Sequence, residues 1–220
     1  MRDAFPRQFV IFAWMIAGGF LLTAIPALLE VAAGGETPLL WWSARVLGLL
    51  AYVALWLSNL FGVFVAGRGA GDLLDRATVM QFHKRWALAA LATTALHVLV
   101  VVGDPASGVT PLAALIPMAS STLRGPVAVG TLALWGMAAI AGSTALYGTI
   151  PRWGWRAIHA SAFGTYALAL VHGVTAGSET GVPAVQALYI GTAAVLLGAV
   201  VHRTLMFWHR TRQSADRGAG

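Results

Sequence analysis

The sequence contains no cysteine and few charged residues. Of its 220 residues none is cysteine and 10% are charged, against roughly 25% in ordinary soluble domains. The absence of cysteine excludes disulfides, cysteine-ligated iron–sulfur clusters and thiolate-ligated haem, so that a redox metal would need histidine ligands. The scarcity of charge, beside 58% hydrophobic residues, excludes a soluble domain, because a chain of this size cannot hide so much apolar surface from water.

Six apolar segments are each long enough to cross about 30 Å of hydrocarbon, which takes about 20 residues. They are residues 9–32, 39–66, 82–102, 127–150, 158–176 and 185–207, and the gaps between them are rich in glycine and proline. We therefore predict an all-α integral membrane protein. One six-helix transmembrane domain would cover residues 1–210, and a polar cytoplasmic tail would cover 211–220.

The basic residues lie at the ends of the apolar segments. The formal charge of +6 therefore does not indicate nucleic acid, which would need a basic stripe with interleaved aromatic residues. Twelve of the 14 lysines and arginines fall on the side of the N-terminus, and only Arg45 and Arg124 fall on the other. This bias predicts that both termini are cytoplasmic. The high content of alanine, glycine and tryptophan favours a bacterial plasma membrane.

Four of the six histidines form a pattern. His83 and His97 lie fourteen residues apart on the third segment, and His159 and His172 lie thirteen apart on the fifth. Both segments run outward from the cytoplasm, so His83 and His159 share one depth. His97 and His172 share another, about 20 Å further out at 1.5 Å per residue. Two helices thus offer one imidazole each at two matched depths.

Imidazoles inside a membrane are costly and usually functional. Binding to a metal satisfies one nitrogen and leaves the other for a carbonyl or hydroxyl group. The pattern therefore predicts two haems stacked along the membrane normal, each iron held by one histidine from each helix. The alternative is that the histidines form hydrogen bonds between helices. Thirteen residues miss the same helix face by about 140°, so the fifth helix either bends near Gly164 or presents its ligands from different sides.

His202 and His209 lie at the cytoplasmic end of the last segment among arginines. An interfacial, solvated position is the simpler interpretation, and a contact with a partner or a quinone head group is the alternative.

The segments around the four histidines resemble the haem-binding helices of the ferric reductase-like transmembrane domain. This superfamily includes NADPH oxidases, ferric-chelate reductases and the haem subunit of the bacterial methionine sulfoxide reductase system. The resemblance covers about residues 39–177, and the sixth helix follows by topology only. It is carried by residues 81–86 (QFHKRW), 96–98 (LHV), 155–159 (WRAIH), 170–173 (LVHG) and, on the second helix, 44–62.

The resemblance implies the cofactors and their ligands. It implies two b-type haems, with His83 and His159 on the inner, cytoplasmic-side iron and His97 and His172 on the outer iron.

The two outer arginines are candidates for binding the haem propionates. Arg45 matches an arginine near the outer haem of family members, and a cation at this position needs an anionic partner. The alternative for Arg45 is that it reaches into the lipid head groups. Arg124 is a second candidate for binding a propionate.

The resemblance further implies electron transfer across the membrane, in an oxidoreductase subunit that lacks its own flavin and nicotinamide domain. The glycine-rich stretch 67–71 follows a membrane span and is no strand–turn–helix dinucleotide fingerprint. We therefore expect a separate donor, either a flavoprotein reductase or a quinol, and an acceptor on the outer side. A sulfoxide reductase role fits less well, because that type often lacks one of the four histidines.

Three alternatives stay open at this point. The chain could be an accessory subunit, haem-bearing or structural, of a larger respiratory or photosynthetic membrane complex. It could instead be a haem-free transporter or scaffold in which the histidines line a proton or metal path. A quinol-oxidising cytochrome b would also pair histidines at similar spacing, but the six-helix count and the second-helix arginine segment argue against that family.

Overall fold

The computed structural model describes residues 39–67 and 75–218. Within these ranges all regular secondary structure is helical, as the sequence predicts. The helices, in chain order, are α2 (Leu39–Gly67), α3 (Arg76–Gly103), the short 3-10 helix η1 (Pro105–Ser107), α4 (Pro111–Leu115), α5 (Arg124–Ala145), α6 (Arg152–Ala160), α7 (Ala162–Ala176) and α8 (Pro183–Gly218).

Five of the described segments are long and apolar enough to cross a membrane, namely residues 39–66, 76–103, 124–145, 152–176 and 183–213. Large apolar side chains point away from the bundle, as Leu99 and Leu197 do with exposed fractions of 67% and 65%. Water would penalise such a surface and lipid would not. The described part is therefore that of a multi-pass membrane protein. The first expected span, 9–32, lies outside the described residues, so the count of six stays a prediction.

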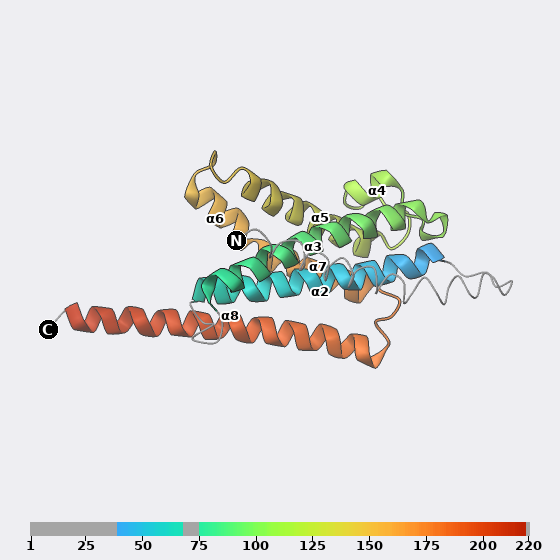
Figure 1. Ribbon diagram of the computed structural model, residues 1–220. Helices are drawn as coiled ribbons and strands as arrows, with labels where there is room; N and C mark the ends of the chain where they lie inside the picture. Colours follow the sequence, from blue (N-terminus) through green and yellow to red (C-terminus); the bar gives the residue numbers. More distant parts are fainter. Residues whose placement is uncertain (1–38, 68–74, 219–220) are drawn as a thin grey trace, which may run out of the picture.

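The helices pack as two pairs joined through α2. Helix α3 lies along α2, and α7 lies along α5, while α2 also contacts α7 and α8 (Figure 1). Helices α3 and α7 do not pack closely on each other. Helix α3, which carries His83 and His97, and α7, which carries His172, are therefore separated by a space.

A buried tyrosine cluster holds α2, α7 and α8 together. The hydroxyl of Tyr52 is hydrogen bonded to the hydroxyl of Tyr166 at 2.8 Å and to that of Thr192 at 2.5 Å. The ring of Tyr52 stacks on Tyr166 and meets Tyr189 edge to face. In addition, Nε1 of Trp56 donates to the backbone carbonyl of Thr192 at 2.9 Å. These polar contacts replace water inside the bundle and fix α8 against α2.

Helix α3 begins at Arg76, six residues before the expected start at residue 82. Asp75 caps it: the carboxylate accepts hydrogen bonds from the backbone N–H and the hydroxyl of Thr78 at 2.8 and 2.7 Å. These bonds stabilise the charged form and lower the pKa of Asp75 below its usual value. Because an N-cap extends a helix beyond its apolar stretch, the apolar run alone placed the start too late.

The fifth span is interrupted at Ser161, three residues before Gly164. The N–H of Ser161 bonds to the carbonyls of Ala157 and Ile158, and its hydroxyl also bonds to the carbonyl of Ile158. A serine hydroxyl that bonds back to the preceding turn competes with the helical ladder and bends the helix. The interruption separates α6, which carries His159, from α7, which carries His172.

Candidate functional site

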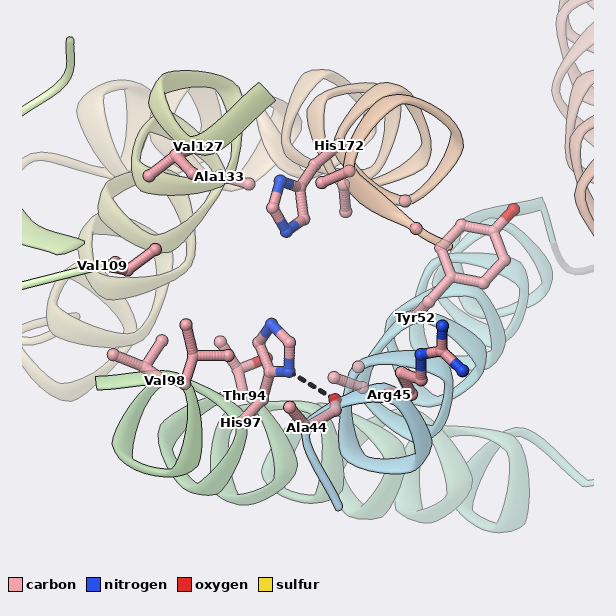
Figure 2. Close-up of a pocket in the computed structure, with 18 of the residues that line it drawn as sticks. Ala44, Arg45, Tyr52, Thr94, His97, Val98, Val109, Val127, Ala133 and His172 are labelled. Carbon is pink, nitrogen blue, oxygen red and sulfur yellow. Dashed lines mark hydrogen bonds between the residues drawn. The ribbon is translucent and has the colours of Figure 1, made fainter. Parts of the chain in front are cut away.

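His97 on α3 and His172 on α7 face each other in the half of the bundle that the distribution of lysine and arginine predicts to be the outer one, and we call them the outer pair. Their ring centroids lie 6.3 Å apart, with the ring planes at 74°. The Nδ1 of His97 is 2.7 Å from the carbonyl oxygen of Ala44, and the Nδ1 of His172 is 2.8 Å from that of Pro126. A carbonyl only accepts hydrogen bonds, so both Nδ1 atoms carry protons. The Nε2 lone pairs are left to point toward each other (Figure 2).

His83 on α3 and His159 on α6 form a second pair. Their ring centroids lie 5.9 Å apart. The Nδ1 of His83 donates to the carbonyl oxygen of Ser58 at 2.8 Å. The ring of His159 stacks on that of Trp155, with centroids 4.7 Å apart, and its buried Nδ1 has no hydrogen-bond partner among the described residues. Three of the four imidazoles therefore have a fixed tautomer, while the fourth is held by stacking.

Three glycines make room for these rings. A Cβ atom at Gly48 would lie 3.1 Å from Cε1 of His97, and one at Gly62 would lie 3.4 Å from Cε1 of His83. A Cβ atom at Gly130 on α5 would lie only 2.7 Å from Cε1 of His172. A larger residue at these positions would push the imidazoles out of place, most strongly at Gly130.

A cavity of about 460 Å³ surrounds the outer pair. This volume lies within the range of about 300–1,000 Å³ that is typical of pockets for small molecules and cofactors. The lining is mostly apolar, and Figure 2 shows His97 and His172 entering it from opposite walls. The lining residues include Arg45, Tyr52, Thr94, Met137 and Glu179.

The spacing of the paired rings suits one metal ion bound by both. A metal–imidazole bond is about 2 Å long, and the centre of a five-membered ring with bonds of ~1.33 Å lies about 1.1 Å behind the nitrogen. An ion bound on both sides therefore separates the ring centres by about 6 Å. The observed distances are 6.3 and 5.9 Å. Within the described ranges no group of three or more histidine, aspartate or glutamate side chains could hold a metal ion.

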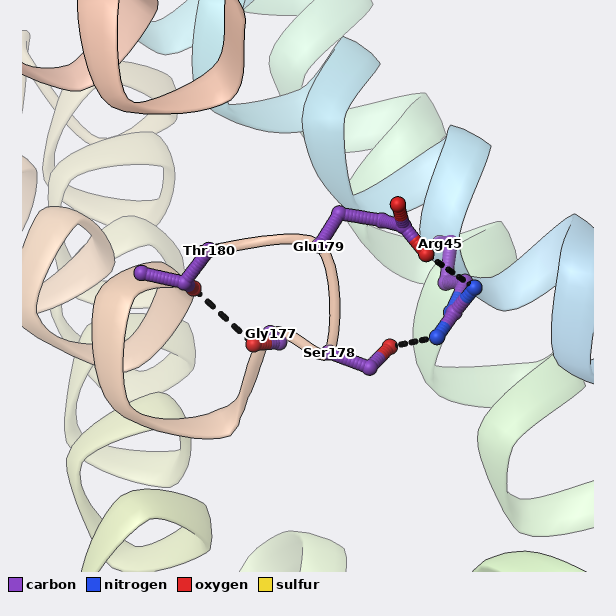
Figure 3. A network of polar contacts seen from close by, with 5 residues as sticks. All are labelled: Arg45, Gly177, Ser178, Glu179 and Thr180. Atoms are coloured by element: carbon purple, nitrogen blue, oxygen red, sulfur yellow. Dashed lines mark hydrogen bonds and ion pairs between the residues drawn. The ribbon is translucent and has the colours of Figure 1, made fainter. Parts of the chain in front are cut away.

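Arg45 lies at the outer end of α2 and lines the same cavity. Its guanidinium is bonded to the carboxylate of Glu179 and to the hydroxyl of Ser178, both in the loop between α7 and α8 (Figure 3). The guanidinium carbon also lies 3.0 Å from the ring centroid of Trp41. Arg45 thus contacts three protein side chains at this end of α2. Arg124, the other candidate, is exposed at the first position of α5.

The sequence did not single out Glu179. Only the fold brings it to Arg45, 134 residues away. The glycines could have been found, because Gly48 and Gly62 are fourteen residues apart, the same spacing as His83 and His97 on the neighbouring antiparallel helix. His202 and His209 are exposed on α8, away from both pairs.

The fold and the site define an all-helical, multi-pass membrane protein with two facing histidine pairs between its spans. The chain belongs to a family described as a domain of unknown function, DUF8596, whose profile matches residues 39–179. The match covers both histidine pairs, Arg45 and Glu179. No curated protein matches the chain.

Proposed function

We propose that the chain is a transmembrane di-haem b-type cytochrome of the ferric reductase-like kind. It would pass electrons across the membrane, from a separate cytoplasmic-side flavoprotein reductase or quinol to an acceptor on the outer side. The observation that carries the proposal is the presence of two facing histidine pairs, with ring centroids 6.3 and 5.9 Å apart, at two depths of the bundle.

The residues of the two pairs fit b-type haem. His97 and His172 would hold the outer iron, and His83 and His159 the inner iron. Hydrogen bonds from Nδ1 to backbone carbonyls fix the ring orientation and make Nε2 a stronger donor to a metal. The glycines beside these rings leave the space that the imidazoles occupy, which a Cβ atom would fill. Bound haem would supply an iron that alternates between its ferric and ferrous states.

The two histidine pairs lie at different depths of the bundle. His97 follows His83 by fourteen residues on the uninterrupted α3, a rise of about 21 Å. One site therefore lies near each face of the membrane. Two axial histidines leave an iron without an open position, so the outer acceptor would be reduced at the edge of the porphyrin. The distribution of lysine and arginine supports a cytoplasmic position for both termini, and the membrane would be a bacterial plasma membrane.

Absorption spectra of the full chain, purified in mild detergent, test this function. We expect a Soret band and sharp reduced α bands of six-coordinate low-spin haem, with two haems per chain. The His97→Ala/His172→Ala variant should keep one haem, whereas His202→Ala should keep both. Absence of haem from the wild-type chain, or two haems in the double variant, would overturn the proposal. If the protein contained no haem, metal analysis would then show whether it binds metal ions, as a metal transporter would and a scaffold would not.

A further inference from the structure

Arg45 is the only lysine or arginine that lines the outer cavity within the described residues. Its side chain is 13% exposed, while that of its partner Glu179 is 35% exposed. The buried Nε of Arg45 has no hydrogen-bond partner among the described residues. The Nε–H group of Arg45 is therefore a free hydrogen-bond donor in the described part of the chain, whereas the other two nitrogens of the guanidinium are bonded to Glu179 and Ser178.

The loop that carries Glu179 is fixed to the end of α7. The hydroxyl of Thr180 lies 2.9 Å from the carbonyl oxygen of Gly177, to which it donates (Figure 3). It also lies within hydrogen-bond distance of the carbonyl oxygen of Val174, at 3.1 Å. These bonds cap the helix that carries His172, five residues before Gly177. The carboxylate of Glu179 is thus held at the rim of the cavity into which His172 points.

The second acid of the cavity is already engaged. Asp104 is buried, and its carboxylate accepts a hydrogen bond from the backbone N–H of Ala106 at 2.9 Å, which caps η1. Glu179 is therefore the acid that neutralises Arg45. A ligand that brings its own carboxylate to Arg45 would place two anions on one cation in a region of low dielectric, which is unfavourable.

We propose that Glu179 is a built-in competitor for Arg45, which weakens the binding of a ligand that brings its own carboxylate to the outer cavity and leaves a ligand without a carboxylate unaffected. The incoming carboxylate takes the guanidinium, and Glu179, the more exposed of the two partners, turns outward into water. The inference rests on the proposed function, in which the ligand is haem b with its two propionates. A ligand without a carboxylate leaves the Arg45–Glu179 pair intact and gains nothing from Arg45.

Titration of the haem-free full chain with ferric haem b, and separately with its dimethyl ester, tests whether Glu179 competes with the ligand for Arg45. Glu179→Gln keeps the shape of the side chain and removes its charge. We expect it to bind haem b about two- to fivefold more tightly than the wild type does, the range that one partly exposed ion pair allows. Affinity for the dimethyl ester should be unchanged. The same titrations in a His159→Ala background identify the affected site as the outer one.

Two control variants separate competition from other effects. Asp75→Asn removes a distant charge at a helix cap where asparagine also serves, and should leave both affinities unchanged. In an Arg45→Met background the effect of Glu179→Gln should vanish. If Glu179→Gln bound haem b more weakly than the wild type, Glu179 would support the binding site by holding Arg45 in place, and the inference would be wrong. An equal gain in affinity for haem b and for its dimethyl ester would also overturn it. If the wild type bound no haem, the proposed function itself would fall, and the inference with it.

Discussion

Replacing Gly130 by alanine should release the outer cofactor and leave the inner one bound. The new Cβ atom would stand 2.7 Å from both Cε1 and Nδ1 of His172, and an ordinary contact begins at 3.4 Å, so the ring must retreat by about 0.7 Å. The ring cannot simply rotate away, because its Nδ1–H is bonded to the carbonyl of Pro126 on the same helix as Gly130. Metal–ligand distances tolerate changes of only about 0.2 Å. We therefore expect the outer site to lose about 10- to 100-fold in affinity, as when other partners of a ligating histidine are disturbed.

The assay is the haem-to-protein ratio of the purified variant, together with the α band of the reduced protein. Gly130→Ala should retain about one haem where the wild type holds two. Gly142→Ala is the matched control on α5, because a Cβ atom there meets nothing within 4 Å and alanine favours the helix. It should keep both haems. Two haems and an unchanged spectrum in Gly130→Ala would refute the reasoning that this glycine positions His172.

The other two glycines make the prediction quantitative. A Cβ atom would lie 3.1 Å from the ring of His97 at Gly48 and 3.4 Å from the ring of His83 at Gly62. Alanine should therefore have an intermediate effect at Gly48 and almost none at Gly62. A ranking of haem loss that does not follow these distances would show that crowding is not the cause.

Two further variants test the fold. Tyr52→Phe removes the hydrogen bonds to Tyr166 and Thr192 and should destabilise the protein by about 1–3 kcal/mol, seen as a lower melting temperature in detergent. An unchanged melting temperature would mean that the tyrosine cluster does not hold α8. Asp75→Ala should destabilise the protein at neutral pH, because the folded state lowers the pKa of Asp75, so its charged form contributes stability above the unfolded pKa. That contribution is lost as the pH falls through the lowered pKa, so the difference from the wild type should shrink in acid, and a pH-independent difference would contradict this account.

The spans could be predicted from the sequence because their apolar runs are long, whereas their ends could not. Capping moved the start of α3 to Arg76, and the bond from the hydroxyl of Ser161 to the preceding turn divided the fifth span. Neither effect is visible in hydropathy, which averages over windows longer than a single turn. The thirteen-residue spacing left two possibilities open, a bend near Gly164 or ligands on different sides of the helix, and the interruption lies at Ser161, three residues before that glycine.

The histidine pairs could be deduced from the expected depth of each histidine in the membrane. Two spans that run in the same direction, with histidines fourteen and thirteen residues apart, place those histidines at matching depths. The structure places the same histidines side by side, and their binding of haem stays a prediction. The partner of Arg45 could not be deduced, since Glu179 lies in a loop whose path depends on how α7 ends. Side chains that meet through loops carry no periodic signal in the sequence.

On the proposed function, the space between α3 and α7 would make the stability of the bundle depend on the molecule bound there. A molecule bound to imidazoles on both helices is a cross-link between the two halves of the bundle, and it stabilises only the assembled form. By mass action, a free ligand at 100 times its Kd adds about 2.7 kcal/mol to the assembled state. On the proposed function, a cell short of haem would hold a loosened bundle that proteases degrade sooner, so the abundance of this protein would follow the haem supply.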